Sequence, residues 1–253
     1  MTKILLINPR FSAFNVDTDA ELESLPVGLI CLGSFLVSKG FAVKIVDCLA
    51  ITDYLEVIQR ELESCLCAGI SVMTSQVPEA LKISHLIREQ KPNIPIVWGG
   101  IHPTLFPEET AIDPFVDYVV RGEGEVTFLE LIEALQKNSD PQQIEGLTYF
   151  TNNHKISNAE RQFVNMDDLP PINWGLLDAS ILNRIKLVPA HTSRGCSHRC
   201  TFCINSVTRN HWRGRSAQRG LDELEIIKRR FGDTRVRFWD EDFFGKKTRA
   251  LEM

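Results

Sequence analysis

The sequence predicts an α/β protein with a doubly wound parallel sheet, followed by the beginning of a second α/β unit. In residues 1–137, short apolar runs alternate with amphipathic segments of helical length, and the alternation restarts near residue 186. The runs are almost continuously apolar, which indicates strands that helices cover on both faces. With 253 residues and 43% hydrophobic side chains, the chain can bury the cores of two such domains.

The elements of the first domain follow from these patterns. The apolar runs predict strands over 3–9, 42–47, 67–72, 94–100 and 116–125. The periodic segments predict helices over 28–40, 54–64, 78–90 and 127–137. This succession is typical of a Rossmann-like domain with the flavodoxin-like strand order, and ligands of such sheets lie beyond the carboxyl ends of the strands.

The remainder divides into a linker and a second domain. Residues 138–185 break the alternation with a small hairpin around "GLTYFTNNHKIS" and the proline-bearing "MDDLPPINW". The alternation then gives a strand over 185–190, a cysteine-rich loop, a helix over 221–231 and a strand over 234–244 that runs into an acidic loop. The predicted boundaries are therefore 1–137 for the first domain, 138–185 for the linker and 186–253 for the second domain.

Composition narrows the class of protein. The net charge is −5 and the basic residues are scattered until about residue 209, which argues against a nucleic-acid partner. The longest apolar stretch, "LPVGLICLGSFLV", is too short for a membrane span, and the first residues lack the core of a signal peptide. We expect a cytoplasmic protein without a membrane span, in which clustered cysteines are metal or redox ligands rather than disulfides.

Three of the seven cysteines lie in "SRGCSHRCTFCINS", residues 193–206, with the spacing C-x3-C-x2-C. Three thiolates on one loop can bind three irons of a [4Fe–4S] cluster and leave the fourth iron open for chemistry. The alternative is a structural zinc site with a histidine as fourth ligand, for which the candidates are His191, His198 and His211. Zinc ligands usually come as two short pairs, and no second pair follows here, because the other cysteines all lie in the first domain.

The loop resembles the cluster-binding motif of the radical S-adenosylmethionine (SAM) enzymes, with Phe202 in its aromatic position. The resemblance implies that Cys196, Cys200 and Cys203 bind a [4Fe–4S] cluster and that Phe202 lies near the adenine of SAM. It also implies that the second domain is the start of a radical SAM partial (β/α) barrel. Ser197 departs from the family, in which many members carry proline, and this change removes nothing that the chemistry needs.

The acidic loop "WDEDFF" follows the second strand of this domain, where the family places polar groups that hold the SAM amino group. The resemblance therefore makes three acidic residues candidate SAM contacts: Asp240, Glu241 and Asp242. The alternative is an ordinary solvated acidic loop.

A nicotinamide dinucleotide is one candidate ligand of the first domain. That fingerprint needs glycines directly after the first strand, and "NPRFSAFN" contains none, so Asp47 is expected to be a simple strand-end cap. The domain instead resembles cobalamin-binding domains through "GISVMTS", "PIVWGGIHPT" and "VVRGEGEVTF". Glycines at a strand end let a bulky ligand approach the backbone, although Gly-Gly is also an ordinary turn and Met73 ordinary core. The implied cobalamin contacts are Ser71, Met73, Thr74, Gly99, Gly100, His102, Pro103 and Glu123.

One departure concerns the lower face of cobalt. The Asp-x-His-x-x-Gly motif of many cobalamin domains, whose histidine replaces the axial base, is absent, as is common in radical SAM methyltransferases. His102 is expected to shape the loop around the corrin, with ligation of cobalt as the alternative.

Together the resemblances imply a cobalamin-dependent radical SAM enzyme, a methyltransferase or the catalyst of a related radical rearrangement at an unactivated carbon. Its expected cofactors are a [4Fe–4S] cluster, SAM and cobalamin. Its expected partners are a small-molecule substrate and an electron donor such as flavodoxin or ferredoxin.

Only about two of the six strand–helix units of a radical SAM core fit after Lys186, so we expect a fragment or a chain that needs a complementing chain. The alternative is a non-catalytic cobalamin- and cluster-binding or regulatory protein.

Overall fold

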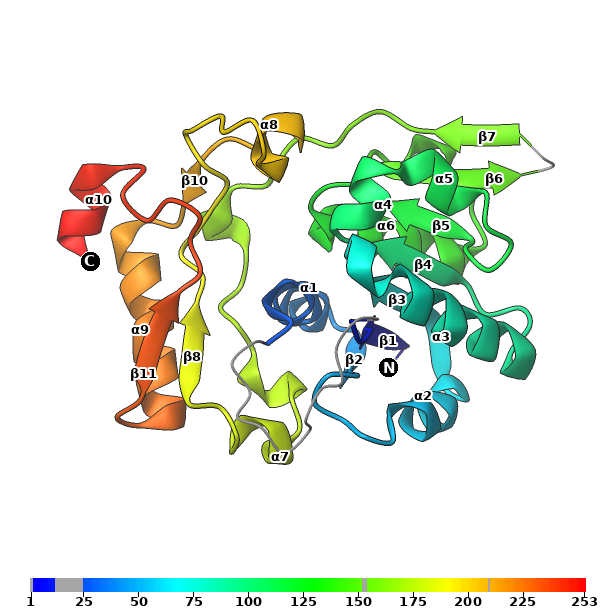
Figure 1. Cartoon of the computed structure of the whole chain (residues 1–253), viewed down its shortest axis with the longest axis horizontal. Helices are drawn as coiled ribbons and strands as arrows, with labels where there is room; N and C mark the ends of the chain where they lie inside the picture. The colour runs from blue at the N-terminus through cyan, green and yellow to red at the C-terminus, as the bar shows by residue number, and fades with distance from the viewer. Residues whose placement is uncertain (1, 12–24, 152–153, 209) are drawn as a thin grey trace. The chain divides into compact units, whose positions relative to one another are not determined.

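The computed structural model describes residues 2–11, 25–151, 154–208 and 210–253 (Figure 1). They form two compact units, which are described separately. The described residues of the first unit fall within 2–11, 28–163 and 173–177, and those of the second within 25–27, 164–172 and 178–253.

The first unit contains a seven-stranded sheet in the order β2-β1-β3-β4-β5-β6-β7. Neighbours among β1 to β5 pair in parallel, and β5–β6 and β6–β7 pair antiparallel. The parallel part has the order 2-1-3-4-5, which confirms the predicted doubly wound domain. The strands are β1 (Lys3–Asn8), β2 (Ala42–Asp47), β3 (Cys65–Ser71), β4 (Ile96–Gly99), β5 (Tyr118–Val120), β6 (Leu147–Thr151) and β7 (His154–Ser157).

Helices cover the sheet and complete its core (Figure 1). They are α1 (Val27–Ser38), α2 (Tyr54–Leu62), α3 (Val77–Gln90), α4 (Ile101–Leu105), α5 (Pro107–Ala111) and α6 (Gly124–Lys137), with 3-10 turns η1 (Thr74–Gln76), η2 (Pro141–Gln143) and η4 (Trp174–Leu176). The central strands β1, β3 and β4 bury most of their side chains, and the indole N–H of Trp98 donates to Ser84 Oγ at 3.0 Å. None of the helices in the described part of the chain has the length and apolar character needed to cross a membrane.

Three features of this unit differ from expectation. The predicted hairpin forms, but β6 pairs with β5 and so extends the sheet. The strand expected over 116–125 is only Tyr118–Val120, because Gly122 has φ of +72° and α6 begins two residues later. Helices α4 and α5 were not predicted, because five residues are too few to show a helical period.

The second unit contains the expected strand, loop, helix and strand. β8 (Leu187–Ala190) pairs in parallel with β11 (Arg235–Phe238), and α9 (Ala217–Phe231) lies between them in the chain. The predicted strand over 234–244 is shorter because the chain turns after Phe238, whose ring packs 4.6 Å from that of Phe243. The other elements are α7 (Ala179–Leu182), β9 (Ser193–Arg194), α8 (Ile204–Thr208), β10 (Arg213–Gly214), α10 (Lys247–Glu252) and the 3-10 turn η3 (Met166–Asp168).

Part of the predicted linker is held tightly by the second unit. The buried Arg215 guanidinium donates to the carbonyls of Met166, Leu169 and Pro170 at 3.1, 2.9 and 3.0 Å. The backbone N–H of Ile172 donates to the carboxylate of the buried Glu223. Residues 164–172 therefore form an ordered strap across this unit rather than a free connection.

Candidate functional site

Most of the predicted cobalamin contacts gather at the carboxyl ends of β3 and β4. Ser71 pairs with Gly99 in the sheet, and the N–H of Val72 donates to the Gly99 carbonyl at 2.8 Å. The N–H of His102 then donates to the Val72 carbonyl at 3.0 Å. These bonds join the two strand ends and the start of α4 into one surface.

The two glycines at the end of β4 have different structural reasons. Gly100 has φ of +96°, and a Cβ on it would lie 3.0 Å from Val72 N and 3.1 Å from Ser71 Oγ. The backbone itself therefore requires Gly100, whether or not a ligand approaches it, and the expectation that this glycine also makes room for a ligand stays a prediction. A Cβ on Gly99 would meet only Val120, at 3.7 Å or more, which is ordinary contact.

His102 is tied into the loop that carries it. Its Nδ1 lies 3.3 Å from Thr74 Oγ1, and its ring lies 5.2 Å from that of Phe106. Burial lowers the pKa of His102, and the charge of Glu109 opposes this more weakly, so the imidazole is neutral at neutral pH. These contacts suit the predicted role of His102 in shaping the loop.

A second link connects this surface to the loop after β5. The hydroxyl of Thr104 donates to the Gly100 carbonyl at 2.7 Å and accepts from the N–H of Gly122 at 3.0 Å. Glu123 follows Gly122 and stands at the N-cap of α6, half-buried. Pro103 is buried in α4, so its side chain supports the loop from within.

Large apolar side chains are exposed on the same surface. Met73, Ile101 and Phe106 are 38%, 44% and 43% exposed. Exposed apolar groups of this size at the ligand-binding edge of a doubly wound sheet fit a broad, largely apolar cofactor such as a corrin. The prediction did not include Ile101 and Phe106, although Ile101 stands inside the Gly-Gly-x-His-Pro segment that carried the resemblance and Phe106 follows that segment by three residues.

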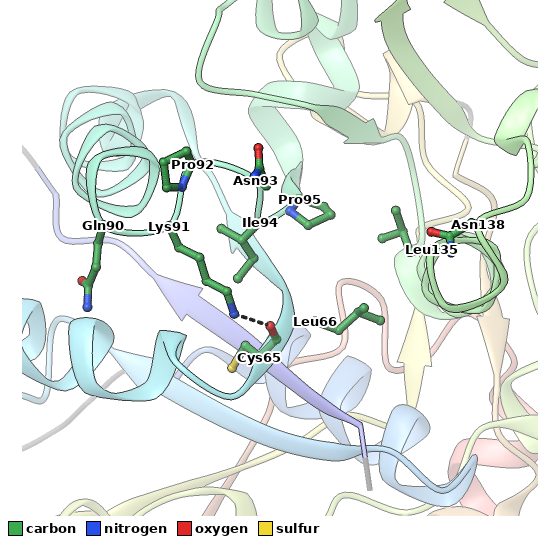
Figure 2. Close-up of a pocket in the computed structure, with 10 residues that line it drawn as sticks. All are labelled: Cys65, Leu66, Gln90, Lys91, Pro92, Asn93, Ile94, Pro95, Leu135 and Asn138. Atoms are coloured by element: carbon green, nitrogen blue, oxygen red, sulfur yellow. Dashed lines mark hydrogen bonds between the residues drawn. The ribbon is translucent and has the colours of Figure 1, made fainter.

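A pocket in the first unit lies at the amino ends of β3 and β4, opposite the carboxyl ends that carry the predicted contacts (Figure 2). Its lining includes Cys65 at the start of β3, Ile94 and Pro95 just before β4, and Leu135 of α6. The Lys91 amine there is satisfied by backbone carbonyls of Leu62 and Cys65, each at 3.0 Å. The pocket is thus at the amino ends of the strands, away from the predicted contacts.

Asp47 is confirmed as a strand-end cap. Its Oδ1 accepts from Asn8 Nδ2 at 2.8 Å and from the N–H of Leu49 at 3.2 Å. The side chain is fully buried, and burial raises its pKa.

The predicted cluster ligands lie on a loop that the solvent can reach. Cys200 is exposed, and Cys196 and Cys203 are half-buried. Gly195, before the first predicted ligand, has φ of +74°, and a Cβ there would overlap the His211 carbonyl oxygen, so only glycine fits. In the first unit, by contrast, burial raises the pKa of the thiols of three cysteines: Cys48, Cys65 and Cys67.

The three loop thiols are not drawn together. Among the described residues, no group of three or more His, Cys, Asp or Glu side chains is arranged to hold a metal ion. The side chains are therefore arranged neither for the predicted cluster nor for the alternative zinc ion. The donor set of three thiols on one short, accessible loop fits a [4Fe–4S] cluster chemically.

The acidic loop lies against the cysteine loop. Asp240 accepts from the N–H and hydroxyl of Thr192, each at 2.8 Å, and Asp242 accepts from Ser197 Oγ at 2.6 Å. Glu241 is exposed, and Phe202 is 92% exposed. The alternative of a merely solvated loop therefore fits Glu241 but not its two neighbours.

Comparison with known proteins identifies the class. Residues 16–132 match the B12 binding domain family. The chain is 34% identical to an uncharacterized methyltransferase of Pyrococcus horikoshii, over 99% of this chain and 56% of the relative. It is 29% identical to an anaerobic magnesium-protoporphyrin IX monomethyl ester cyclase of Synechocystis, over 95% of this chain and 50% of the relative.

Solved structures agree on the fold. OxsB, a cobalamin-dependent SAM radical enzyme solved with aqua-cobalamin and SAM, matches all of this chain and 35% of its own with a TM-score of 0.82 and 24% identity. TsrM, a radical SAM methyltransferase from Kitasatospora setae, matches 99% of this chain and 49% of its own with a TM-score of 0.76 and 21% identity. The sheet and the following βαβ unit thus define a B12-binding domain joined to the start of a radical SAM barrel. The chain belongs to the family of radical SAM proteins that carry a B12-binding domain, and it spans about half the length of the curated relatives it matches.

Proposed function

We propose that a protein containing this chain is a cobalamin-dependent radical SAM enzyme that cleaves SAM reductively at a [4Fe–4S] cluster. The observation that carries the proposal is the accessible loop with Cys196, Cys200 and Cys203, which directly follows a barrel-type strand in a chain that also has a B12-binding domain. The cytoplasm, where thiols remain reduced, is the proposed location.

The first unit would hold the cobalamin. The surface formed by Ser71, Gly99 and the exposed Met73 would receive the cofactor, and the neutral imidazole of His102 would hold the loop beside it. Thr74 supports His102, and Gly100, Pro103 and Glu123 fix the adjoining turns. Exposed apolar side chains there favour a bulky cofactor over water.

The second unit would hold the cluster and SAM. The three cysteine thiolates would bind iron, and the exposed Phe202 would pack on the adenine of SAM. Glu241 and Asp242 would attract the amino group of SAM. The sequence-based prediction also assigns Asp240 to this amino group. The reduced cluster supplies the electron that cleaves SAM, and methylcobalamin supplies a methyl group. The protein contributes binding, orientation and exclusion of side reactions.

The proposed reaction is methylation of an unactivated carbon in a small molecule, with electrons from a flavodoxin or ferredoxin. Relatives named as methyltransferases support this reaction, among them cytidylyl-2-hydroxyethylphosphonate methyltransferase of Streptomyces wedmorensis, at 25% identity. The relatives named as cyclases support the second candidate, a radical rearrangement or ring closure.

The non-catalytic alternative rests on the open edge of β11. Every residue of this strand is exposed, including Val236 and Phe238, at 36% and 39%. An unpaired strand edge with exposed apolar side chains on the same strand favours pairing with a further strand, from a longer chain or a complementing chain, which would enclose the site. A cobalamin- and cluster-binding protein that requires such a partner would show the same edge.

Product formation separates these proposals. Reconstituted with iron, sulfide and hydroxocobalamin, the 253-residue chain is expected to bind both cofactors but to release little 5′-deoxyadenosine from SAM and a strong reductant. A longer product, or a complementing chain with the remaining strands, should restore release. Binding of both cofactors without release in any such completed protein would favour the non-catalytic alternative, and failure to bind either would contradict both.

A further inference from the structure

Thr192 connects β8 to the cysteine loop and is completely buried. Its N–H donates to Asp240 Oδ1 and its hydroxyl to Asp240 Oδ2, both at 2.8 Å. Its carbonyl accepts from the N–H of Arg215 and from a terminal nitrogen of Arg249, both at 2.9 Å. Every polar group of Thr192 is thus held by the protein.

Asp240 holds two consecutive residues at the base of the loop. It is the second residue after β11, and besides Thr192 it accepts from the N–H of Ser193. Hydrogen bonds to a carboxylate are about twice as strong as those between neutral groups. Both carboxylate oxygens are therefore engaged in holding the loop, which leaves the exposed Glu241 freer to meet a ligand.

Arg249 joins the two ends of the cysteine-bearing segment. From α10, its Nε donates to the Arg215 carbonyl at 2.6 Å, while its terminal nitrogen reaches the Thr192 carbonyl. The Thr192 carbonyl directly precedes β9, where the loop begins, and the Arg215 carbonyl directly follows β10, where the loop ends. These two strands pair with each other. The guanidinium also lies 5.8 Å from the ring centres of Trp212 and Phe243.

Burying this cation is costly. Arg249 is 4% exposed, its second terminal nitrogen has no partner among the described residues, and burial lowers its pKa against the opposing charge of Asp240. A buried charge without a paired ion destabilises the fold unless its hydrogen bonds compensate. The bonds that it does make converge on the base of the cysteine loop.

We propose that Asp240 and Arg249 are positioning residues for the cluster, which clamp Thr192 and thereby fix the base of the loop that carries the three cysteines. The inference rests on the proposed cluster, and it assigns Asp240 to retention of the cluster rather than to contact with SAM. The amide protons of Thr192 and Ser193 allow the clamp to be tested without any metal.

Hydrogen–deuterium exchange on the full, metal-free chain tests the clamp directly. In Asp240→Ala, the peptide that covers residues 191–196 should exchange at least about tenfold faster than in the wild type, and in Thr192→Val more modestly faster. Helix α9 should keep its wild-type rate. An unchanged rate in residues 191–196, or equal acceleration of α9 in both variants, would overturn the clamp.

Reconstitution then asks whether the clamp acts on the cluster. Asp240→Ala and Arg249→Gln should lose iron to a chelator at least about tenfold faster than the wild type. The matched controls Glu241→Ala and Lys247→Gln, in exposed neighbours, should lose it at the wild-type rate, while Glu241→Ala alone should weaken the effect of SAM on the spectrum of the reduced cluster. Equal retention in Asp240→Ala and Glu241→Ala would refute the positioning role, whereas a wild-type chain that binds no cluster would refute the proposed function instead.

Discussion

Alanine at Gly99 and at Gly100 should separate stability of the fold from affinity for cobalamin. At Gly100, alanine would adopt φ of +96° and ψ of −165°, a region open essentially only to glycine. Its Cβ would also press on the Val72 backbone at 3.0 Å. At Gly99, alanine would make only ordinary contacts with Val120.

The expected changes in the free energy of unfolding follow from these contacts. Backbone strain of about 1–3 kcal/mol and overpacking of a similar size should make Gly100→Ala about 2–6 kcal/mol less stable. Gly99→Ala should remain within about 0.5 kcal/mol of the wild type. It should nevertheless bind cobalamin about tenfold more weakly, because its methyl group lies on the surface that we propose for the cofactor.

Urea unfolding followed by circular dichroism measures the first effect, and absorbance titration with hydroxocobalamin measures the second, scaled to the folded fraction. If Gly100→Ala were as stable as the wild type, the structural reason given for this glycine would be wrong. If Gly99→Ala bound cobalamin as tightly as the wild type, the cofactor would not approach the end of β4.

Two further predictions concern buried charge. Burial raises the pKa of Asp47 above its ordinary 3.8, so the stability that its protonated form provides is present below that pH and is lost as the pH rises through the folded pKa. Asp47→Asn removes this titration, so its stability relative to the wild type should be greater at about pH 7 than at about pH 4 in urea unfolding; an equal difference at both would contradict the assignment. Arg215→Ala should lower the free energy of unfolding by about 3 kcal/mol, because three carbonyls of the strap lose their donor. It should also expose residues 164–172 to a protease of broad specificity, whereas the control Arg229→Ala, at an exposed position, should resist cleavage. Equal resistance in both variants would show that the strap is held by other contacts.

The sheet of the first unit could be predicted because each strand is a short apolar run buried on both faces. The run "KILLIN" gives β1, with its four central residues fully buried, and Gly40 marks the turn that leads into β2. The pairing of β6 with β5 could not be predicted, because a hairpin with one polar face does not reveal which edge it joins.

The candidate site was predictable where the signal is local. The spacing of Cys196, Cys200 and Cys203 lies within eight residues, so the sequence alone indicates their shared role. The role of Asp240 depends on Thr192, which is 48 residues away in the chain, and no periodicity or spacing connects them. A similarly long separation, 57 residues, hid the contact of Arg249 with Thr192.

Anaerobic reconstitution of the chain with iron and sulfide, followed by measurement of bound metal, tests the assignment of the cysteine loop most directly. We expect a brown protein with about four irons per chain, and the iron should be lost when Cys196, Cys200 or Cys203 is changed to alanine. The buried controls Cys65→Ala and Cys67→Ala should retain the iron. A colourless protein that carries one zinc per chain, or iron that persists in the loop variants, would contradict the assignment of this loop to a [4Fe–4S] cluster.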